Sequence, residues 1–303
     1  MMINHYNNSH KGHLPVRVLQ HNIIAQFEST TANFLSTTLD VIKNQGLKSE
    51  IIYTVNRNAS NGEKVKGPFV YNCAKEIHIQ ETFLAYLWCM TYSLYIYSDL
   101  LISEQLNEKN PRRLLANNAF SYALSLIENY SDWDTVSIPN PEKYSPEHAS
   151  DIEKTNELFL YGVNFILCHE FSHVDLGHCE ASTRGFLSDL EKKEFEMEAD
   201  KQAIDLLVEG IFPQNESATK YGVAIALSSL LFFNSKVARK IHPDSDVRIM
   251  NALEQFSIEG NDTSWLIACS ALWLWSSNYS IEVTWEEKDS FSELYKSLSR
   301  QLN

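Results

Sequence analysis

Residues 169–173 read His-Glu-Phe-Ser-His, and these side chains can do hydrolytic chemistry together. On a helix, side chains four positions apart lie on one face, so His169 and His173 can bind a single metal ion. Glu170 lies about 100° further round the helix, near enough to take a proton from an attacking water. The motif is short enough to occur by chance, so the surrounding sequence has to support it.

A buried helix over 150–176 is expected to carry this motif. The stretch 158–168 is apolar almost all round, which is typical of a helix buried on every side. Ser150 and Glu153 form a capping-box pattern at its start, and Gly177 is suited to its end. Polar side chains in such a helix are unfavourable unless they are paired or bind metal. A metal site is therefore favoured over the alternative, two core histidines with a surface glutamate between them.

A second helix is expected over 188–209. Ser188 and Glu191 form another capping-box pattern, and Gly210 is a suitable stop. The connection between the two helices is long enough for the second to fold back antiparallel to the first.

This second helix supplies candidates for a third metal ligand, since a hydrolytic zinc site needs three protein ligands and one open position. Glu196 and Asp200 lie four positions apart and share a face, whereas Glu198 points elsewhere. We expect Glu196 to bind the metal and Asp200 to accept a hydrogen bond from a ligand imidazole. The alternatives are ligation by Glu198, or an ordinary solvated acidic face.

His178 is another candidate for the third ligand. In the metzincin pattern the third histidine follows the second by six positions, whereas here the offset is five and Gly177 falls one place late. We expect His178 to close the C-terminus of the first helix or to form a hydrogen bond nearby, with metal ligation as the alternative.

Three elements of the sequence together carry a family resemblance. They are the HExxH motif, the ExxxD motif in which Ala199 precedes Asp200, and His242-Pro-Asp-Ser-Asp-Val-Arg248-Ile. The first two resemble the gluzincin metallopeptidases, and the third is similar to a segment of the heat-shock and CaaX-processing membrane metallopeptidases. Length, motif position and the lack of convincing transmembrane segments resemble instead the Lit-type phage-exclusion peptidases of bacteria. The match covers about residues 150–250.

The resemblance implies a zinc-dependent endopeptidase that holds one zinc ion per chain. It assigns the following roles: His169, His173 and Glu196 as zinc ligands, Glu170 as general base, Asp200 as the partner of a ligand, and His242 and Arg248 as groups that stabilise the oxyanion. Alternatively, His242 before Pro243 ends a helix, and Arg248 is a buried ion-pair partner of an acidic residue.

The resemblance also implies partners. Members of the Lit family are described as cleaving elongation factor Tu when a phage capsid peptide is present. The expected function is therefore phage exclusion, an antiviral defence, with elongation factor Tu as protein substrate and a phage peptide as activator. The alternatives are a regulatory or housekeeping metallopeptidase with another substrate, and a non-catalytic protein with a closed structural zinc site.

Composition excludes several classes of protein. Of the 303 residues, 44% are hydrophobic and 21% charged, as in globular proteins. The net charge of −14 without a basic cluster argues against nucleic-acid binding. Five cysteines without CxxC spacing, and an N-terminus unlike a signal peptide, favour a cytoplasmic protein with reduced thiols. The charge-free stretches 82–98, 221–235 and 264–280 are shorter than a membrane span, so no membrane partner is expected.

The expected fold is mainly α, of the α+β class, with a zincin-like helical core and a small β-sheet in the N-terminal half. The expected division is a mobile N-terminus (1–20), a helical lobe with a β-hairpin (21–145) and a helical zinc-peptidase lobe (146–303), or one continuous domain. Strands at 49–56 and 67–72 flank a hairpin signal at 58–62, and 76–79 alternates. We expect this region to form a small sheet that edges the cleft, as in zincins, where such a sheet aligns an extended substrate by strand addition. The remaining helices are expected at 22–44, 81–102, 112–129, 218–238, 245–257, 263–277 and 285–300.

Overall fold

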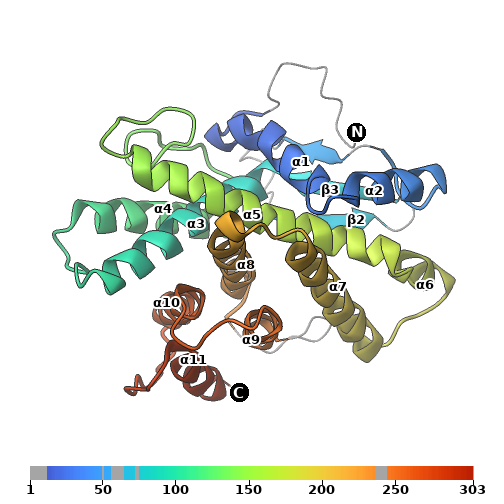
Figure 1. Cartoon of the computed structure of the whole chain (residues 1–303). Coiled ribbons are helices and arrows are strands. Elements are labelled where there is room, and N and C mark those ends of the chain that lie inside the picture. The colour runs from blue at the N-terminus through green and yellow to red at the C-terminus, as the bar shows by residue number, and fades with distance from the viewer. Residues whose placement is uncertain (1–11, 50, 56–64, 72–74, 236–243, 303) are drawn as a thin grey trace.

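The computed structural model describes residues 12–49, 51–55, 65–71, 75–235 and 244–302. Helices dominate them, with a three-stranded sheet in the N-terminal half, as predicted (Figure 1). In chain order the elements are η1 (Pro15–Leu19), α1 (Gln20–Glu28), α2 (Phe34–Lys43), β1 (Ile52–Thr54), β2 (Phe69–Tyr71), β3 (Glu76–Gln80), α3 (Glu81–Ile102), α4 (Pro111–Glu128), α5 (Ala149–Asp175), α6 (His178–Arg184), α7 (Asp189–Glu209), η3 (Pro213–Asn215), α8 (Glu216–Ser229), η4 (Leu230–Phe233), α9 (Ser245–Gln255), α10 (Thr263–Asn278) and α11 (Phe291–Arg300).

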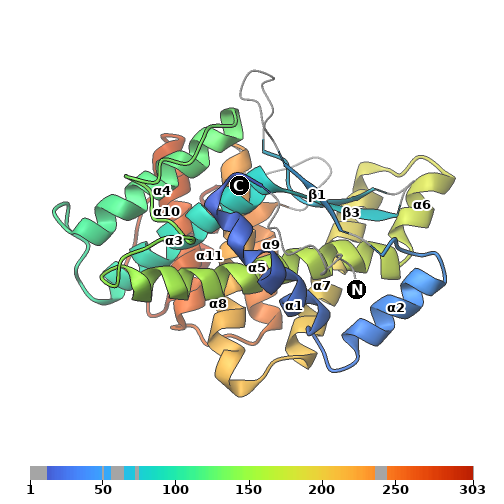
Figure 2. The ribbon, with the colours of Figure 1, turned by 90° about the horizontal axis from the view of Figure 1, so that it is seen from above.

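The long helix α5 is the centre of the molecule. In Figure 1, α1, α2 and the sheet lie on one side of it, and α7 to α11 lie on the other. Figure 2 shows the strands over the C-terminal half of α5, which carries the HExxH motif. Apolar side chains all round its middle bury this helix, as its sequence predicts.

The start of α5 differs from the prediction. His148 is the N-cap residue and no side chain caps the helix, so the capping-box interpretation of Ser150 and Glu153 is wrong. The chain already turns before this point, because the amide of His148 donates to the carbonyl of Ser145. Helical hydrogen bonding therefore begins from the carbonyl of His148, and Ser150 lies inside the first turn.

Two glycines let α8 approach α5 closely. A β-carbon on Gly222 would lie 2.6 Å from the Cβ of Tyr161 and 2.8 Å from the backbone nitrogen of Gly162. Such contacts are too short for any side chain, so glycine is required at this crossing. The close crossing fixes α5, and with it the motif, against the C-terminal half of the molecule.

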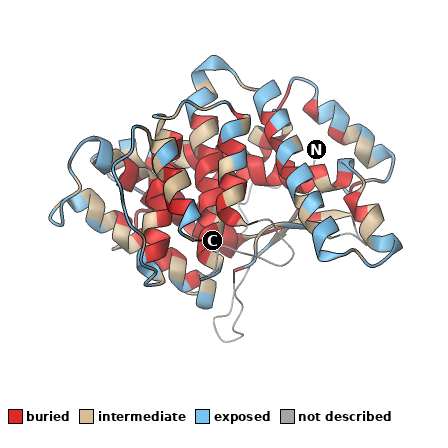
Figure 3. Ribbon diagram, turned by 90° about the horizontal axis from the view of Figure 1, so that it is seen from below, coloured by how far each residue is buried: buried red, intermediate tan, exposed pale blue. Residues whose placement is uncertain are grey.

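One contiguous hydrophobic core includes buried side chains from both sides of the predicted boundary at residue 145 (Figure 3). It contains most of α3, whose side chains are buried on nearly every face, and much of α5, α8 and α10. Among the described residues, no helix is both long and apolar enough to span a membrane.

The sheet has the strand order β1-β3-β2. The predicted hairpin between the first two strands is wrong, because β3 lies between them, parallel to β1 and antiparallel to β2. The hairpin signal at 58–62 lies outside the described residues. As a result β2 is an edge strand, and its free side faces α5.

The N-terminal segment also differs from its prediction. Residues 12–19, expected within a mobile terminus, are packed, with Leu14 and Val16 buried. The helix predicted over 22–44 is interrupted at residues 29–33, where the Thr30 hydroxyl donates to the carbonyl of Phe27. Local hydrogen bonds of this kind compete with helix continuation.

Near the C-terminus, the last helix begins at Phe291, six residues later than predicted, with Ser290 as its N-cap. The prediction for 218–238 corresponds to α8 followed by η4, and part of it lies outside the described residues. The short helix α6 was not predicted.

Candidate functional site

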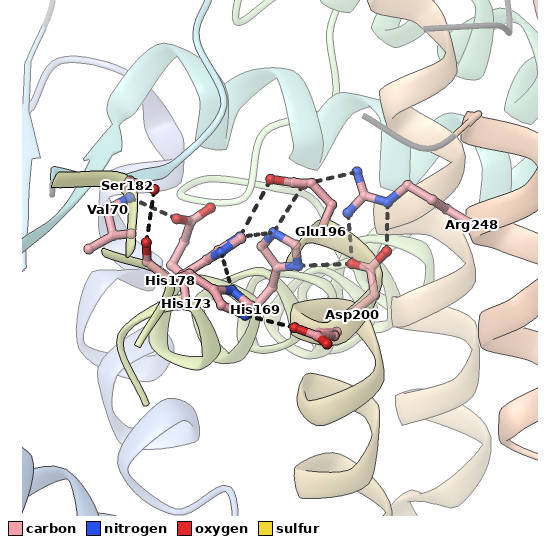
Figure 4. A network of polar contacts seen from close by, with 10 residues as sticks. Val70, His169, His173, His178, Ser182, Glu196, Asp200 and Arg248 are labelled. Carbon is pink, nitrogen blue, oxygen red and sulfur yellow. Dashed lines mark hydrogen bonds and ion pairs between the residues drawn. The ribbon is translucent and has the colours of Figure 1, made fainter. Parts of the chain in front are cut away.

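The C-terminal half of α5 and the middle of α7 bring the three predicted zinc ligands together (Figure 4). The Nε2 atoms of His169 and His173 lie 3.1 Å apart. Glu196 places one carboxylate oxygen 3.5 Å from the Nε2 of His169 and the other 3.5 Å from the Nε2 of His173. As predicted, α7 folds back against α5, and this arrangement brings the three side chains together.

These three side chains have the spacing that a zinc ion requires. Zinc binds nitrogen and oxygen at about 2.0–2.1 Å, so ligand atoms at the corners of a tetrahedron lie about 3.3 Å apart. The two histidine nitrogens, 3.1 Å apart, are close to that value, and each lies 3.5 Å from a different oxygen of Glu196. Among the described residues, His169, His173 and Glu196 form the one cluster of such side chains able to hold a metal ion.

Asp200 lies behind His169, one turn along α7 from Glu196. Its Oδ1 atom is 2.9 Å from the Nδ1 of His169, within ion-pair distance, although the ring N–H is not aligned for a straight hydrogen bond. Burial lowers the pKa of His169, but the carboxylates of Asp200 and Glu196 outweigh it and raise the pKa to about 10. The same negative charge favours a bound cation.

Arg248, which lies in α9, holds Asp200 of α7 in place. Its Nε and Nη2 atoms each donate to one oxygen of Asp200 at 2.7 Å, a bidentate pair. Its Nη1 atom lies 4.0 Å from Glu196. Burial raises the pKa of Asp200, but the charge of Arg248 outweighs it and keeps the pKa below its usual value. The ion-pair alternative for Arg248 is therefore the one observed, while its role toward an oxyanion stays a prediction.

Glu170 is buried and points toward the edge strand β2. Its Oε2 atom accepts a hydrogen bond of 2.7 Å from the backbone N–H of Val70. Burial raises the pKa of Glu170 to about 7, against the opposing charge of His169. A carboxyl group with this pKa can both take up and release a proton near neutral pH. Sequence reasoning missed Val70, since its contribution is a backbone N–H and no side-chain pattern signals it.

His178 lies on the opposite side of His173 from the ligand cluster. The two Nδ1 atoms are 3.0 Å apart, and the Nε2 of His178 is 3.0 Å from Glu198. The expectation of a hydrogen bond nearby is therefore confirmed. The expectation that His178 closes the end of α5 is wrong, because Leu176 is the C-cap and His178 begins α6.

Burial also acts on the histidines of this side. Burial, together with the charge of the neighbouring His169, lowers the pKa of His173 to about 3. The pKa of His178 is likewise lowered by its burial. Both rings are therefore neutral at physiological pH, the form in which imidazole binds metal.

The ligand cluster opens into a cavity of about 520 Å³. Apolar side chains make up most of its wall, and Lys192 and Arg248 add positive charge. The apolar part includes Val65, Pro68, Phe69, Val70, Phe83, Phe165, Ile166, Leu187, Phe195, Leu230 and Phe233. A cavity of this size with a mainly apolar wall and a few charged groups is typical of a ligand-binding site.

The structure thus brings together six of the seven predicted site residues. They are His169, Glu170, His173, Glu196, Asp200 and Arg248. The seventh, His242, lies outside the described residues, and its predicted role is untested.

No curated protein and no solved structure matches the chain. One protein-family model does, that of peptidase U49, over residues 77–268. The matched region is more than half of the chain and contains every predicted site residue. The chain therefore belongs to the peptidase U49 family.

Proposed function

We propose that this peptidase is a zinc-dependent endopeptidase that hydrolyses a protein substrate. The single observation that carries the proposal is the cluster of His169, His173 and Glu196, whose ligand atoms are close enough together to hold one metal ion and which faces an open cavity. A structural zinc site is closed by four protein ligands, whereas three ligands beside a cavity leave room for water and substrate.

His169, His173 and Glu196 would hold the ion, which supplies Lewis acidity toward water and the scissile carbonyl. Glu170 takes a proton from the attacking water as the oxygen of that water bonds to the carbonyl carbon. The same carboxyl then gives the proton to the leaving amine as the carbon–nitrogen bond breaks. Burial raises the pKa of this carboxyl group, which helps it to hold the proton between the two transfers. Asp200 orients His169, and Arg248 keeps Asp200 charged and fixed.

The edge strand β2 would align the substrate. Pro68, Phe69 and Val70 line the cavity, and the N–H of Val70 points away from β3 toward Glu170. In an antiparallel strand the carbonyl of a residue points to the same side as its N–H, so the carbonyl of Val70 also faces the cleft. Because the N–H of Val70 is bonded to Glu170, an extended peptide would hydrogen-bond to the carbonyl of Val70 on that side of the strand.

For the substrate we propose elongation factor Tu, with a phage peptide as activator and phage exclusion as the biological role. Support comes from the resemblance to Lit-type peptidases and from membership of a peptidase family. We also propose a cytoplasmic location, which suits both this substrate and the four described cysteines, all free and buried.

The decisive test compares wild type with Glu170→Gln and with Glu194→Gln as a matched control, since Glu194 is an exposed glutamate of α7. Metal analysis is expected to find one zinc per chain in all three proteins. Proteolysis is expected in wild type and in the control, with a rate about 10²–10⁴-fold lower in Glu170→Gln. Equal cleavage by Glu170→Gln contradicts the mechanism, and zinc without any cleavage indicates a structural site.

The substrate is tested separately. Wild-type enzyme is incubated with bacterial elongation factor Tu, with and without phage lysate, and the products are separated by electrophoresis. We expect a discrete cut that requires the lysate and is absent with Glu170→Gln. If general proteolysis is present but elongation factor Tu stays intact, the peptidase has another substrate.

A further inference from the structure

We propose that His178 and Glu198 form a hydrogen-bonded chain that positions His173 for metal binding. The inference rests on the proposed zinc site and adds two positioning residues to it. The motif spacing does not assign either role, because His178 falls at the wrong offset for a third ligand and Glu198 points away from the ligand face.

The geometry separates the two nitrogens of His173. Its Nε2 atom faces Glu196 at 3.5 Å and the Nε2 of His169 at 3.1 Å. Its Nδ1 atom, on the other edge of the ring, lies 3.0 Å from the Nδ1 of His178. His178 is therefore behind the ring of His173, where it can orient that ring but cannot share its metal ion (Figure 4).

The position of each proton follows from the acceptor at the end of the chain. The carboxylate of Glu198 only accepts hydrogen bonds, so the Nε2 of His178, 3.0 Å away, carries a proton. The Nδ1 of a neutral His178 is then a bare acceptor. The proton between the two facing rings belongs to the Nδ1 of His173, and the Nε2 of His173 keeps its lone pair for the metal.

The packing of His178 holds it in this orientation. Its ring lies parallel to that of Phe195 with centroids 4.1 Å apart, and its side chain is buried. Gly177, in the left-handed region with φ of 76°, lets the chain turn at the end of α5 so that α6 begins at His178. The Ser182 hydroxyl donates to the carbonyl of His178 within α6.

Two substitutions of His178 separate hydrogen bonding from packing. His178→Phe keeps a ring against Phe195 but removes the acceptor. His178→Asn loses the ring but places an amide oxygen near the position of Nδ1, so it restores an acceptor for His173. Unfolding of each metal-free protein checks that both variants are folded.

The main measurement is zinc affinity, obtained by competition with a chromophoric chelator, together with the visible spectrum of the cobalt-substituted proteins. His178→Phe is expected to bind zinc about 10–100-fold more weakly than wild type, with an altered cobalt spectrum. His178→Asn is expected to stay within about threefold of wild type. An unchanged affinity in His178→Phe, or equal losses in both variants, overturns the proposal.

A second measurement needs no metal. Long-range ¹H–¹⁵N NMR of the histidine-labelled, metal-free protein reports which ring nitrogen carries each proton. We expect the proton on Nδ1 of His173 and on Nε2 of His178, and loss of the His173 preference in His178→Phe. A proton on the Nδ1 of His178 overturns the proposal. If wild type binds no zinc, the proposed function fails. The tautomers of His173 and His178 in the metal-free protein still decide whether the hydrogen-bonded chain to Glu198 exists.

Discussion

The two histidines of the motif are supported in different ways on their two sides. Behind His169 lies a charged pair, Asp200 and Arg248, in which both side chains are almost fully buried. Behind His173 lies the ring of His178, followed by Glu198, whose side chain is 60% exposed. The first support joins α5 to α7 and to the more distant α9, whereas the second is built by the consecutive helices α5, α6 and α7.

The difference predicts that the support behind His169 contributes to the stability of the fold, whereas the support behind His173 mainly orients the ring. A buried ion pair that loses one partner leaves an uncompensated charge in the interior, with a large loss of stability. An exposed carboxylate keeps its solvation, so its contact adds little to stability. The predictions below test whether the two supports differ in this way.

The largest effect is expected for Asp200→Ala. The substitution leaves Arg248 charged and buried without its main partner, so the free energy of unfolding should fall by about 3–5 kcal/mol. Urea unfolding of the metal-free protein measures it. Asp205→Ala is the matched control, since Asp205 lies on the same helix in an exposed contact with Lys201, and should change stability by less than about 0.5 kcal/mol. A similar small loss in Asp200→Ala would remove the contrast.

Metal removal is expected to come next. Free zinc at about 100 times its dissociation constant stabilises a protein that binds it by about 2.7 kcal/mol, which a chelator should abolish. In Asp200→Ala a tenfold weaker affinity at the same zinc concentration would reduce this increment to about 1.4 kcal/mol. Thermal unfolding with and without chelator measures both values. An equal increment in the two proteins would show that Asp200 does not act on the metal site.

Arg248→Lys is expected to have an intermediate effect. Lysine keeps the positive charge near Asp200 but cannot form the two parallel hydrogen bonds of the guanidinium. We expect a loss of about 1–2 kcal/mol in urea unfolding, smaller than that of Asp200→Ala. A loss as large as that of Asp200→Ala would mean that the shape of the pair matters more than its charge.

The smallest effect on stability is expected for Glu198→Gln. The amide oxygen can still accept a hydrogen bond from His178, and the site is exposed, so unfolding should shift by less than about 0.5 kcal/mol. Zinc affinity should fall by no more than about threefold, well short of the expected effect of His178→Phe. A destabilisation comparable to that of Asp200→Ala would show that the two supports are alike.

Local spacing was enough to predict much of the site. The two histidines four positions apart, and Glu196 and Asp200 four positions apart on the next helix, meet because both helices are long and begin and end near their signals. The capping box at Ser188 is present and fixes the start of α7. Periodicity and caps act within one or two turns, so sequence can predict them, although the capping-box pattern at Ser150 was wrong.

The features of the fold and the site that could not be predicted from the sequence depend on contacts between distant segments. The insertion of β3 between β1 and β2 depends on pairing between separate segments of the chain, and a turn signal does not encode it. The same holds for the hydrogen bond from Val70 to Glu170, which joins residues 100 positions apart. The role of His178 was hard to predict because the left-handed turn at Gly177 changes the direction of the chain just before this residue.

The hydrogen bond between Val70 and Glu170 also bears on the solubility of this protein. An unpaired edge strand is a template on which other chains can add strands and aggregate. In β2 the outward N–H of Val70 already donates to Glu170 of α5. A strand from another molecule therefore cannot use this N–H as a hydrogen-bond donor. The contact that sets the position of Glu170 thereby protects the edge of the sheet from indiscriminate pairing.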